Sequence, residues 1–199
     1  YNKMHMKQIL FDKIQKKWVW LIIIASKLAI ISLFLDNFFN DRIHLIHNPT
    51  LDIVFTIMTN FYLLIFVLLF VTTFFMYAEK KREGIIPVWA SLLITTVVVV
   101  LLKLLIARER PQELTDVAWF MYSFPSLHAA LCFTVLPTLD IEFPKHKWAW
   151  ISLAALVGLS RIYLQVHYLS DVLAGCAIGY AIGVWIFHLN KKYYYKIKW

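Results

Sequence analysis

Apolar residues occupy six long runs of the chain, and polar residues are confined to the short stretches between these runs. Most of the runs approach the ~20 residues that an α-helix needs to cross the hydrocarbon core of a bilayer. The runs cover residues 18–35, 53–77, 88–106, 126–139, 148–164 and 172–189. The pattern predicts an all-α integral membrane protein, a bundle of six transmembrane helices. The fourth run is short for a span, so we expect either that its helix extends past Leu139 or that it sits in a locally thin part of the bundle.

The same pattern divides the chain into three parts. Residues 18–190 form one six-helix membrane domain, because six spans leave no room for a separate soluble module. Residues 1–17 carry apolar residues at helical spacing between lysines, which is typical of a basic amphipathic helix on a membrane surface, although a frayed basic tail explains them equally well. Residues 191–199 interleave aromatic residues with lysines, which predicts an interfacial tail.

Composition supports the membrane assignment, and the distribution of charge orients it. Hydrophobic residues make up 61% of the 199 residues, against about 45–50% in soluble proteins. The net charge of +8 suggests a nucleic-acid partner, but fourteen of the 20 Lys and Arg residues lie on one side of a six-span topology. The positive-inside rule makes that side cytoplasmic. We therefore expect a multi-pass protein of the cell membrane with cytoplasmic termini and no nucleic-acid partner.

Three short polar stretches, residues 103–111, 125–128 and 160–171, fall on the opposite side of this topology. Among their residues are three cations (Lys103, Arg110 and Arg161), two imidazoles (His128 and His167) and a carboxylate (Asp171), all near the ends of apolar runs. This is the inventory needed to hold a phosphate and to transfer it through histidine. The sequence therefore predicts an active site at the extracytoplasmic face.

The cations of these stretches have both functional and ordinary explanations. Lys103 and Arg110 are seven residues apart, about 10.5 Å or two turns along a helix, and Pro111 prevents that helix from continuing unbroken. A lone lysine near a helix end commonly extends toward the membrane interface, and Arg108 can be an ordinary loop charge. Arg161 lies about 20 Å along the fifth run, where an arginine must face the bundle interior.

The two histidines lie near expected helix starts. His167 precedes Asp171 by four residues, so the carboxylate can fix the imidazole tautomer and leave Nε2 as a nucleophile. A structural pair between Arg161 and Asp171 is the alternative use of that carboxylate. His128 follows Ser126 at the start of the fourth run, where unpaired backbone N–H groups and the helix dipole favour an anion.

Together the stretches read Lys-x6-Arg-Pro, Pro-Ser-x-His and Ser-Arg-x5-His-x3-Asp. In order and internal spacing this pattern, over residues 103–171, resembles the type 2 phosphatidic acid phosphatase superfamily, the lipid phosphate phosphatases. Leu127 stands where the family usually has glycine between Ser and His, which affects how closely its N–H can approach phosphate.

The resemblance implies a six-helix membrane core and metal-independent hydrolysis through a phosphohistidine intermediate, with no cofactor. It implies that His167 attacks phosphorus, that Asp171 orients His167, and that His128 protonates the leaving oxygen. The residues that it assigns to phosphate binding are Lys103, Arg110, Ser126 and Arg161.

The predicted function is hydrolysis of a lipid mono- or diphosphate on the outer side of the membrane. Undecaprenyl (polyprenyl) diphosphate is the preferred substrate, and phosphatidylglycerophosphate, phosphatidate and lipid A phosphates are alternatives. A haem- or quinone-binding protein would use His128 and His167 but would leave the cations and Asp171 without a role. A transporter is disfavoured because the chain has only five glycines and no matched pair of broken spans. The related vanadium haloperoxidases are soluble proteins, so the six predicted spans disfavour that activity. The expected partners are the lipid phosphate and membrane lipids; the sequence does not indicate the oligomeric state.

Overall fold

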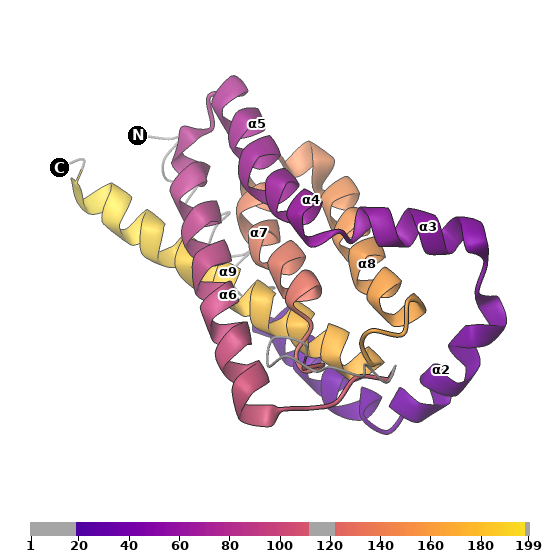
Figure 1. The fold of residues 1–199 in the computed structure, drawn as a ribbon. Helices are drawn as coiled ribbons and strands as arrows, with labels where there is room; N and C mark the ends of the chain where they lie inside the picture. Colours follow the sequence, from indigo (N-terminus) through magenta and orange to yellow (C-terminus); the bar gives the residue numbers. More distant parts are fainter. Residues whose placement is uncertain (1–18, 112–121, 198–199) are drawn as a thin grey trace.

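The computed structural model describes residues 19–111 and 122–197, and within these ranges the chain forms helices and turns without a β-strand (Figure 1). The predicted segment 1–17 lies outside the described residues. A first helix, Val19–Ser32, precedes the labelled ones. The α-helices that follow are α2 Asp36–Ile43, α3 Pro49–Met58, α4 Phe61–Phe66, α5 Thr72–Ala78, α6 Ile85–Ile106, α7 Leu127–Glu142, α8 Lys147–Tyr163 and α9 Leu169–Ile197.

Three of the described helices are long and apolar enough to cross a membrane: Phe61–Ala78, Arg82–Ile106 and Leu169–Asn190. The first of these contains α4, a π-helical segment Val67–Val71 and α5. Val19–Ser32 and α2 are bent by 71° relative to each other and would make a fourth as one broken span. The all-helical fold class is thus confirmed for the described residues, and the count of six spans stays a prediction.

The second apolar run, residues 53–77, was predicted as one continuous helix, and this prediction is wrong. α3 ends at Met58, and α4 begins at Phe61 in a different direction (Figure 1). Asn60 caps α4, its side-chain oxygen accepting from the N–H of Leu63 at 3.2 Å. The break interrupts the apolar run by only two polar residues, Thr59 and Asn60, so the sequence pattern did not indicate it. Residues 36–60, which we call the α2–α3 arm, therefore contact the ends of α8 and α9 from outside the main bundle.

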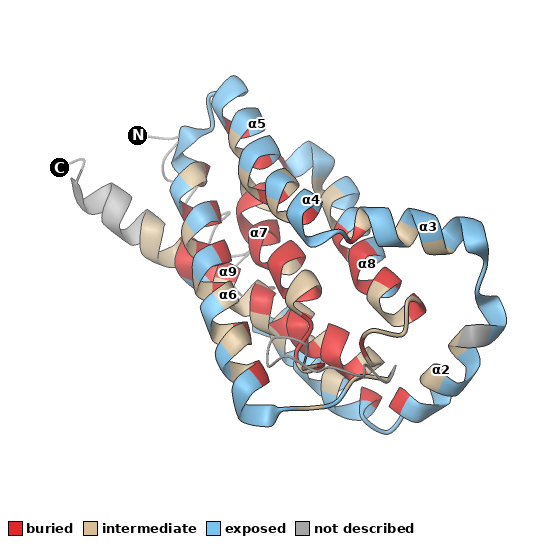
Figure 2. Ribbon diagram, viewed as in Figure 1, coloured by how far each residue is buried: buried red, intermediate tan, exposed pale blue. Residues whose placement is uncertain are grey.

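α7 ends at Glu142, so the helix of the fourth run extends past Leu139, the first of the two alternatives. α7 is the most buried helix, and α6, α8 and α9 pack around it (Figure 2). Large apolar side chains such as Leu105, Phe74 and Trp185 are exposed on the outer faces, as expected for helix surfaces that contact lipid. The sixth helix is longer than predicted, because α9 continues to Ile197 through most of the predicted tail.

Three glycines bring α9 against the backbone of α7. A Cβ atom added to Gly175 would lie 2.5 Å from the Ser126 carbonyl oxygen, and one added to Gly179 would lie 2.1 Å from that of Ala130. Gly183 repeats the 2.1 Å approach one turn further on, at the carbonyl oxygen of Thr134. Small residues at every fourth position allow this close approach of two helix backbones.

The two ends of the bundle differ in chemistry. The end of α6, the start of α7, the end of α8 and the start of α9 gather at one end (Figure 1). The connections at the opposite end, between α5 and α6 and between α7 and α8, carry basic residues. These are Lys80, Lys81, Arg82, Lys145 and Lys147.

Candidate active site

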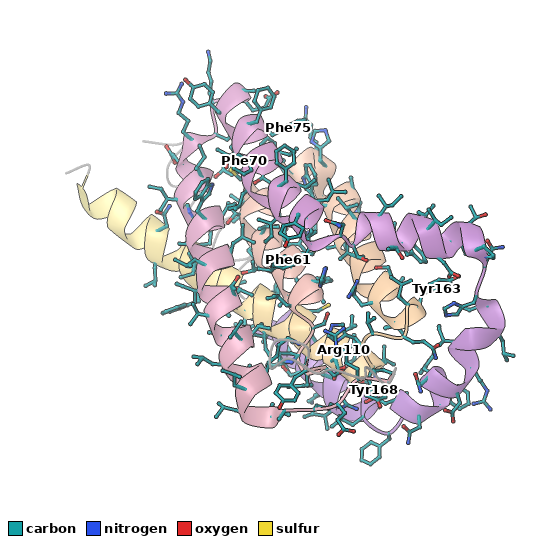
Figure 3. All side chains as sticks on the ribbon, in the orientation of Figure 1. Phe61, Phe70, Phe75, Arg110, Tyr163 and Tyr168 are labelled. Carbon is teal, nitrogen blue, oxygen red and sulfur yellow. The ribbon has the colours of Figure 1, made fainter. Side chains whose placement is uncertain are left out.

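All seven sequence-predicted site residues lie at the end of the bundle where α6 ends and α7 begins. The residues are Lys103, Arg110, Ser126, His128, Arg161, His167 and Asp171. The charge of Arg110 acts on Lys103, on Arg161 and on both histidines, which places side chains from five segments around one space. Figure 3 shows Arg110 at this end of the molecule, on the same side as Tyr168.

His167 lies in the turn between α8 and α9, and Asp171 in the first turn of α9. Both residues are buried: 3% of the surface of His167 and 0% of that of Asp171 is exposed. His167 Nδ1 is 3.6 Å from Asp171 Oδ2, so Nδ1 faces the carboxylate and Nε2 remains for an electrophile. Burial lowers the pKa of His167 to about 4, against the opposing effect of Asp171, which keeps the ring neutral at pH 7.

The carboxylate of Asp171 is held by several donors. Its Oδ2 accepts from the Tyr168 backbone N–H at 2.9 Å and from the Ser123 hydroxyl. Its Oδ1 accepts from Arg108 Nη1 at 2.7 Å. A buried carboxylate with this many donors is fixed in orientation and stays ionised. The structural pair between Asp171 and Arg161 that the sequence left open is therefore not formed, because Arg108 takes that place.

Arg108 is a site residue that the sequence did not identify. Its guanidinium bridges two buried carboxylates, donating to Asp171 Oδ1 at 2.7 Å and to Asp36 Oδ2 at 2.8 Å. Its Cζ lies 4.1 Å from the centroid of the Tyr168 ring. Burial by itself lowers the pKa of Arg108, but Asp36 and Asp171 outweigh it and raise the pKa. The alternative that Arg108 is an ordinary loop charge is wrong.

Lys103 lies in the last turn of α6 and is 3% exposed. Its ammonium donates to the carbonyl oxygens of Tyr122 and Ser123. It therefore faces the bundle interior, and the alternative of a lysine extended toward the membrane interface does not apply. These acceptors are neutral, so the positive charge of Lys103 is not cancelled by them.

Arg110 reaches the site by a route that differs from the expected one. α6 ends at Ile106, and Ala107 follows with a left-handed φ of 47°. Lys103 and Arg110 therefore do not share a helix face two turns apart; the chain turns at Ala107 and the Arg108 carbonyl accepts from the Ser123 N–H at 2.7 Å. Burial lowers the pKa of Arg110, and Asp171 opposes that shift.

His128 and Arg161 both contact Thr59 of the α2–α3 arm. His128 Nε2 lies 2.9 Å from the Thr59 carbonyl oxygen, and Arg161 Nη1 donates to the Thr59 hydroxyl at 2.8 Å. A carbonyl oxygen only accepts, so Nε2 of His128 carries a proton and Nδ1 is the nitrogen that remains for exchange. The Arg161 Nε has no hydrogen-bond partner among the described residues.

Ser126 occupies the N-cap position of α7. Its backbone N–H donates to the Asp171 carbonyl at 3.0 Å, and its buried Oγ has no partner within the described ranges. The N-terminal turn of a helix presents unpaired N–H groups suited to an anion. Leu127, which replaces the glycine of the family pattern, packs against the apolar core.

Four residues of the site were missed from the sequence: Asp36, Thr59, Arg108 and Ser123. Asp36 and Thr59 belong to no motif, and their roles depend on the bends that start and end the α2–α3 arm. Arg108 had one usable signal, its place between two predicted phosphate-binding residues of a single stretch.

Comparisons with known proteins place this arrangement in a family. The sequence model of the PAP2 superfamily matches residues 84–195. Lipid A 1-phosphatase of Rhizobium etli is 30% identical over 118 residues, 51% of this chain and 51% of its own length. Undecaprenyl-diphosphatase of Sulfolobus acidocaldarius is 31% identical over 129 residues, 60% of each chain. This chain thus spans about half to three fifths of the length of these curated relatives.

The fold agrees over a larger part of the molecule. The crystal structure of a PAP2-type phosphatidylglycerolphosphate phosphatase from Bacillus subtilis superposes with a TM-score of 0.62 and 23% identity. The superposition covers 88% of this chain and 95% of that chain. The family resemblance predicted from the three polar stretches is confirmed.

Proposed function

The chain belongs to the PAP2 superfamily, and from this premise we propose that it is a membrane lipid phosphatase that hydrolyses a lipid mono- or diphosphate through a phosphohistidine. The observation that carries the proposal is the buried pair of His167 and Asp171 among Lys103, Arg110 and Arg161. Lys103 and Arg161 donate to neutral oxygens, so an incoming phosphate meets cations that these contacts do not neutralise. Positioning and charge stabilisation are what phosphoryl transfer mainly requires.

In the first step, His167 Nε2 forms a bond to phosphorus while the bond from phosphorus to the lipid oxygen breaks. The electron pair of that bond goes to the leaving oxygen, which takes a proton from His128 Nδ1. For this step the His128 ring is protonated on both nitrogens: it gives up the Nδ1 proton and keeps the Nε2 proton that the Thr59 carbonyl accepts. The phosphorylated ring becomes cationic, and Asp171 stabilises it through Nδ1–H. The 3.6 Å separation shortens to a hydrogen bond at this stage, since catalytic contacts are often long in the free enzyme.

In the second step, water attacks the phosphorus of the phosphohistidine. His128 now acts as the base and takes the water proton, while the nitrogen–phosphorus bond breaks and its electron pair returns to His167 Nε2. Inorganic phosphate leaves, and both rings regain their starting states. Lys103, Arg110 and Arg161 hold the phosphoryl oxygens in both steps, with Ser126 assisting. No step uses a metal ion.

The active site faces the extracytoplasmic side in this proposal. Basic residues at the opposite end of the bundle, between α5 and α6 and between α7 and α8, support that orientation through the positive-inside rule. Undecaprenyl or another polyprenyl diphosphate is the preferred substrate because an outward-facing site suits recycling of a lipid carrier. Phosphatidylglycerophosphate, phosphatidate and a lipid A phosphate are the alternatives.

The test is phosphate release from these four lipids by the purified protein in detergent, with and without EDTA. We expect release from at least one lipid, unchanged by EDTA, and loss of about 10³-fold or more in kcat for His167→Ala, the nucleophile. His146→Ala, a histidine change at the opposite end of the bundle, is the matched control and keeps full activity. Brief reaction with phosphate-labelled lipid should leave acid-labile, base-stable label on His167.

Several results would contradict the proposal. An active His167→Ala protein excludes the phosphohistidine, and loss of activity in EDTA excludes the metal-independent route. Release from none of the four lipids, together with a Soret band in the purified protein, would favour the haem-binding alternative.

A further inference from the structure

Two residues outside the family pattern, Asp36 and Arg108, form a buried link to the nucleophile pair. Asp36 opens α2 and is 3% exposed. Its Oδ1 accepts from the Ser170 N–H at 2.9 Å, and its Oδ2 accepts from the Ser170 hydroxyl at 2.5 Å. Arg108 donates to both Asp36 and Ser170 as well as to Asp171. The first turn of α9 is therefore tied to the start of α2 beside the residue that contacts His167.

Asp36 and Asp171 share the guanidinium of Arg108. A planar guanidinium presents donors in a fixed fork, so it can hold two carboxylates in defined places, which a lysine ammonium does not do. Here one arm of the fork fixes Asp171 Oδ1, and Oδ2 is left for Ser123, for the Tyr168 N–H and for His167. Two carboxylates share one cation, so Asp171 is only partly neutralised and keeps negative charge for His167.

We propose that Asp36 and Arg108 are positioning residues: Arg108 fixes the Asp171 carboxylate against His167, and Asp36 holds Arg108 and moderates its charge. The inference rests on the proposed function, because it assigns the pair a role in the reaction of His167. Neither residue touches the phosphate; both act through Asp171.

The charges around His167 determine how the proposal is tested. The ring faces Asp171 on α9, Lys103 on α6, Arg110 in the following loop and His128 on α7. Arg108→Gln removes a positive charge behind Asp171, so His167 binds a proton more readily and its titration moves to higher pH. Asp36→Asn removes a negative charge from the same network, so the titration moves to lower pH. A purely structural role predicts no such opposite shifts.

The experiment measures two quantities in the full-length protein. One is the pH profile of kcat/KM with the best lipid substrate, whose acid limb reports protonation of the free enzyme. The other is deuterium exchange at Cε1 of the His167 ring, followed by peptide mass spectrometry, which reports the same protonation without turnover. Wild type is expected near pH 4. We expect about one pH unit upward for Arg108→Gln and a smaller downward shift for Asp36→Asn.

Two further variants separate charge from geometry. Arg108→Lys keeps the charge but cannot bridge both carboxylates, so the midpoint stays near wild type while kcat falls about tenfold and KM is unchanged. The double change Asp36→Asn with Arg108→Gln removes one charge of each sign, so the midpoint returns toward wild type and kcat stays low. The controls are Asp41→Asn and Arg42→Gln, the same chemical changes at exposed positions of α2.

The proposal is overturned if Arg108→Gln and Asp36→Asn shift the His167 midpoint no more than the two controls, or if both shift it in the same direction. Full kcat in Arg108→Lys would also overturn it. If Arg108→Gln does not fold, Asp36→Asn and Arg108→Lys decide. If wild type releases no phosphate from any lipid, the proposed function fails, and the exchange midpoints still show whether the pair controls His167.

Discussion

The α7–α9 interface and the α2–α3 arm both hold the site, and they do so by different physical means. α9 meets α7 backbone to backbone, with glycine positions that leave no room for a Cβ atom. The arm meets α8 and the turn after it through hydrogen bonds: Arg161 donates to Thr59, Gln165 to Asn40, and the Asn48 N–H to Tyr163. Close packing of two helix backbones is disturbed by even one added carbon atom. The hydrogen bonds of the arm, in contrast, can be removed individually.

This difference matches what each region supplies. The interface fixes Ser126 and Asp171, joined by a backbone hydrogen bond of 3.0 Å, and these positions belong to the family pattern. The arm supplies Asp36 and Thr59, which adjust the motif side chains from outside. We therefore expect changes in the interface to destabilise the fold. Changes in the arm should alter catalysis while the fold is retained.

The largest effect is expected at Gly179. Gly179→Ala places a Cβ atom 2.1 Å from the Ala130 carbonyl oxygen, so α9 must move away from α7. We expect a loss of about 3 kcal/mol or more in stability, measured by thermal unfolding in detergent and by the yield of monodisperse protein. Gly158→Ala is the control, because its Cβ would lie 3.1 Å from the Val172 Cγ1 atom, the end of a side chain. Equal stability of the two variants would contradict backbone packing as the cause.

An intermediate effect is expected at Thr59. Thr59→Val keeps the shape of the side chain and removes the hydroxyl that accepts from Arg161. A hydrogen bond to a charged group contributes about 1.5 kcal/mol or more, so kcat/KM should fall about tenfold while the melting temperature changes little. Steady-state kinetics and thermal unfolding measure the two. Thr50→Val, at an exposed position of α3, should match wild type in both; an equal loss there would show a general effect on the arm.

The smallest effect is expected at Gln165. Its Nε2 donates to the Asn40 carbonyl at 3.2 Å, and the contact is only partly buried. Alanine tolerates the left-handed φ of 53° no better than glutamine, so Gln165→Ala isolates the side-chain bond. We expect a loss of less than about 1 kcal/mol in the free energy of unfolding and a change in kcat/KM below about threefold. Backbone hydrogen exchange in α2 should become faster. A larger fall than that of Thr59→Val would reverse the order proposed for the arm.

The sequence predicted the parts of the fold that depend on local pattern. Apolar runs located the helices, and the third run ends where α6 ends, at Ile106. The break at Thr59 and the turn at Ala107 were not predicted, because both lie within or beside apolar residues and have no proline or glycine. Local sequence cannot indicate these bends when the tertiary contacts that stabilise them come from residues far along the chain.

For the site, the three stretches were enough to bring all seven predicted residues to one end of the bundle. The stretches could not show which carboxylate each cation would meet. The sequence suggests Arg161 as a partner of Asp171, whereas Arg108 forms that pair because α6 ends at Ile106 and the chain turns at Ala107. Asp36 was beyond reach, since its role depends on the 71° bend that directs α2 across the start of α9.

The interruption between α3 and α4 has a consequence for proton transfer. In an unbroken helix the Thr59 carbonyl would accept from the Leu63 N–H, four residues on. Here the Asn60 side chain takes that donor, and the released carbonyl becomes the acceptor for His128. The Asn60 side-chain amide replaces the Thr59 carbonyl as the acceptor for Leu63. It thereby determines which nitrogen of the His128 ring keeps its proton. Replacing Asn60 with an efficient helix former would restore the regular ladder and withdraw that acceptor from His128.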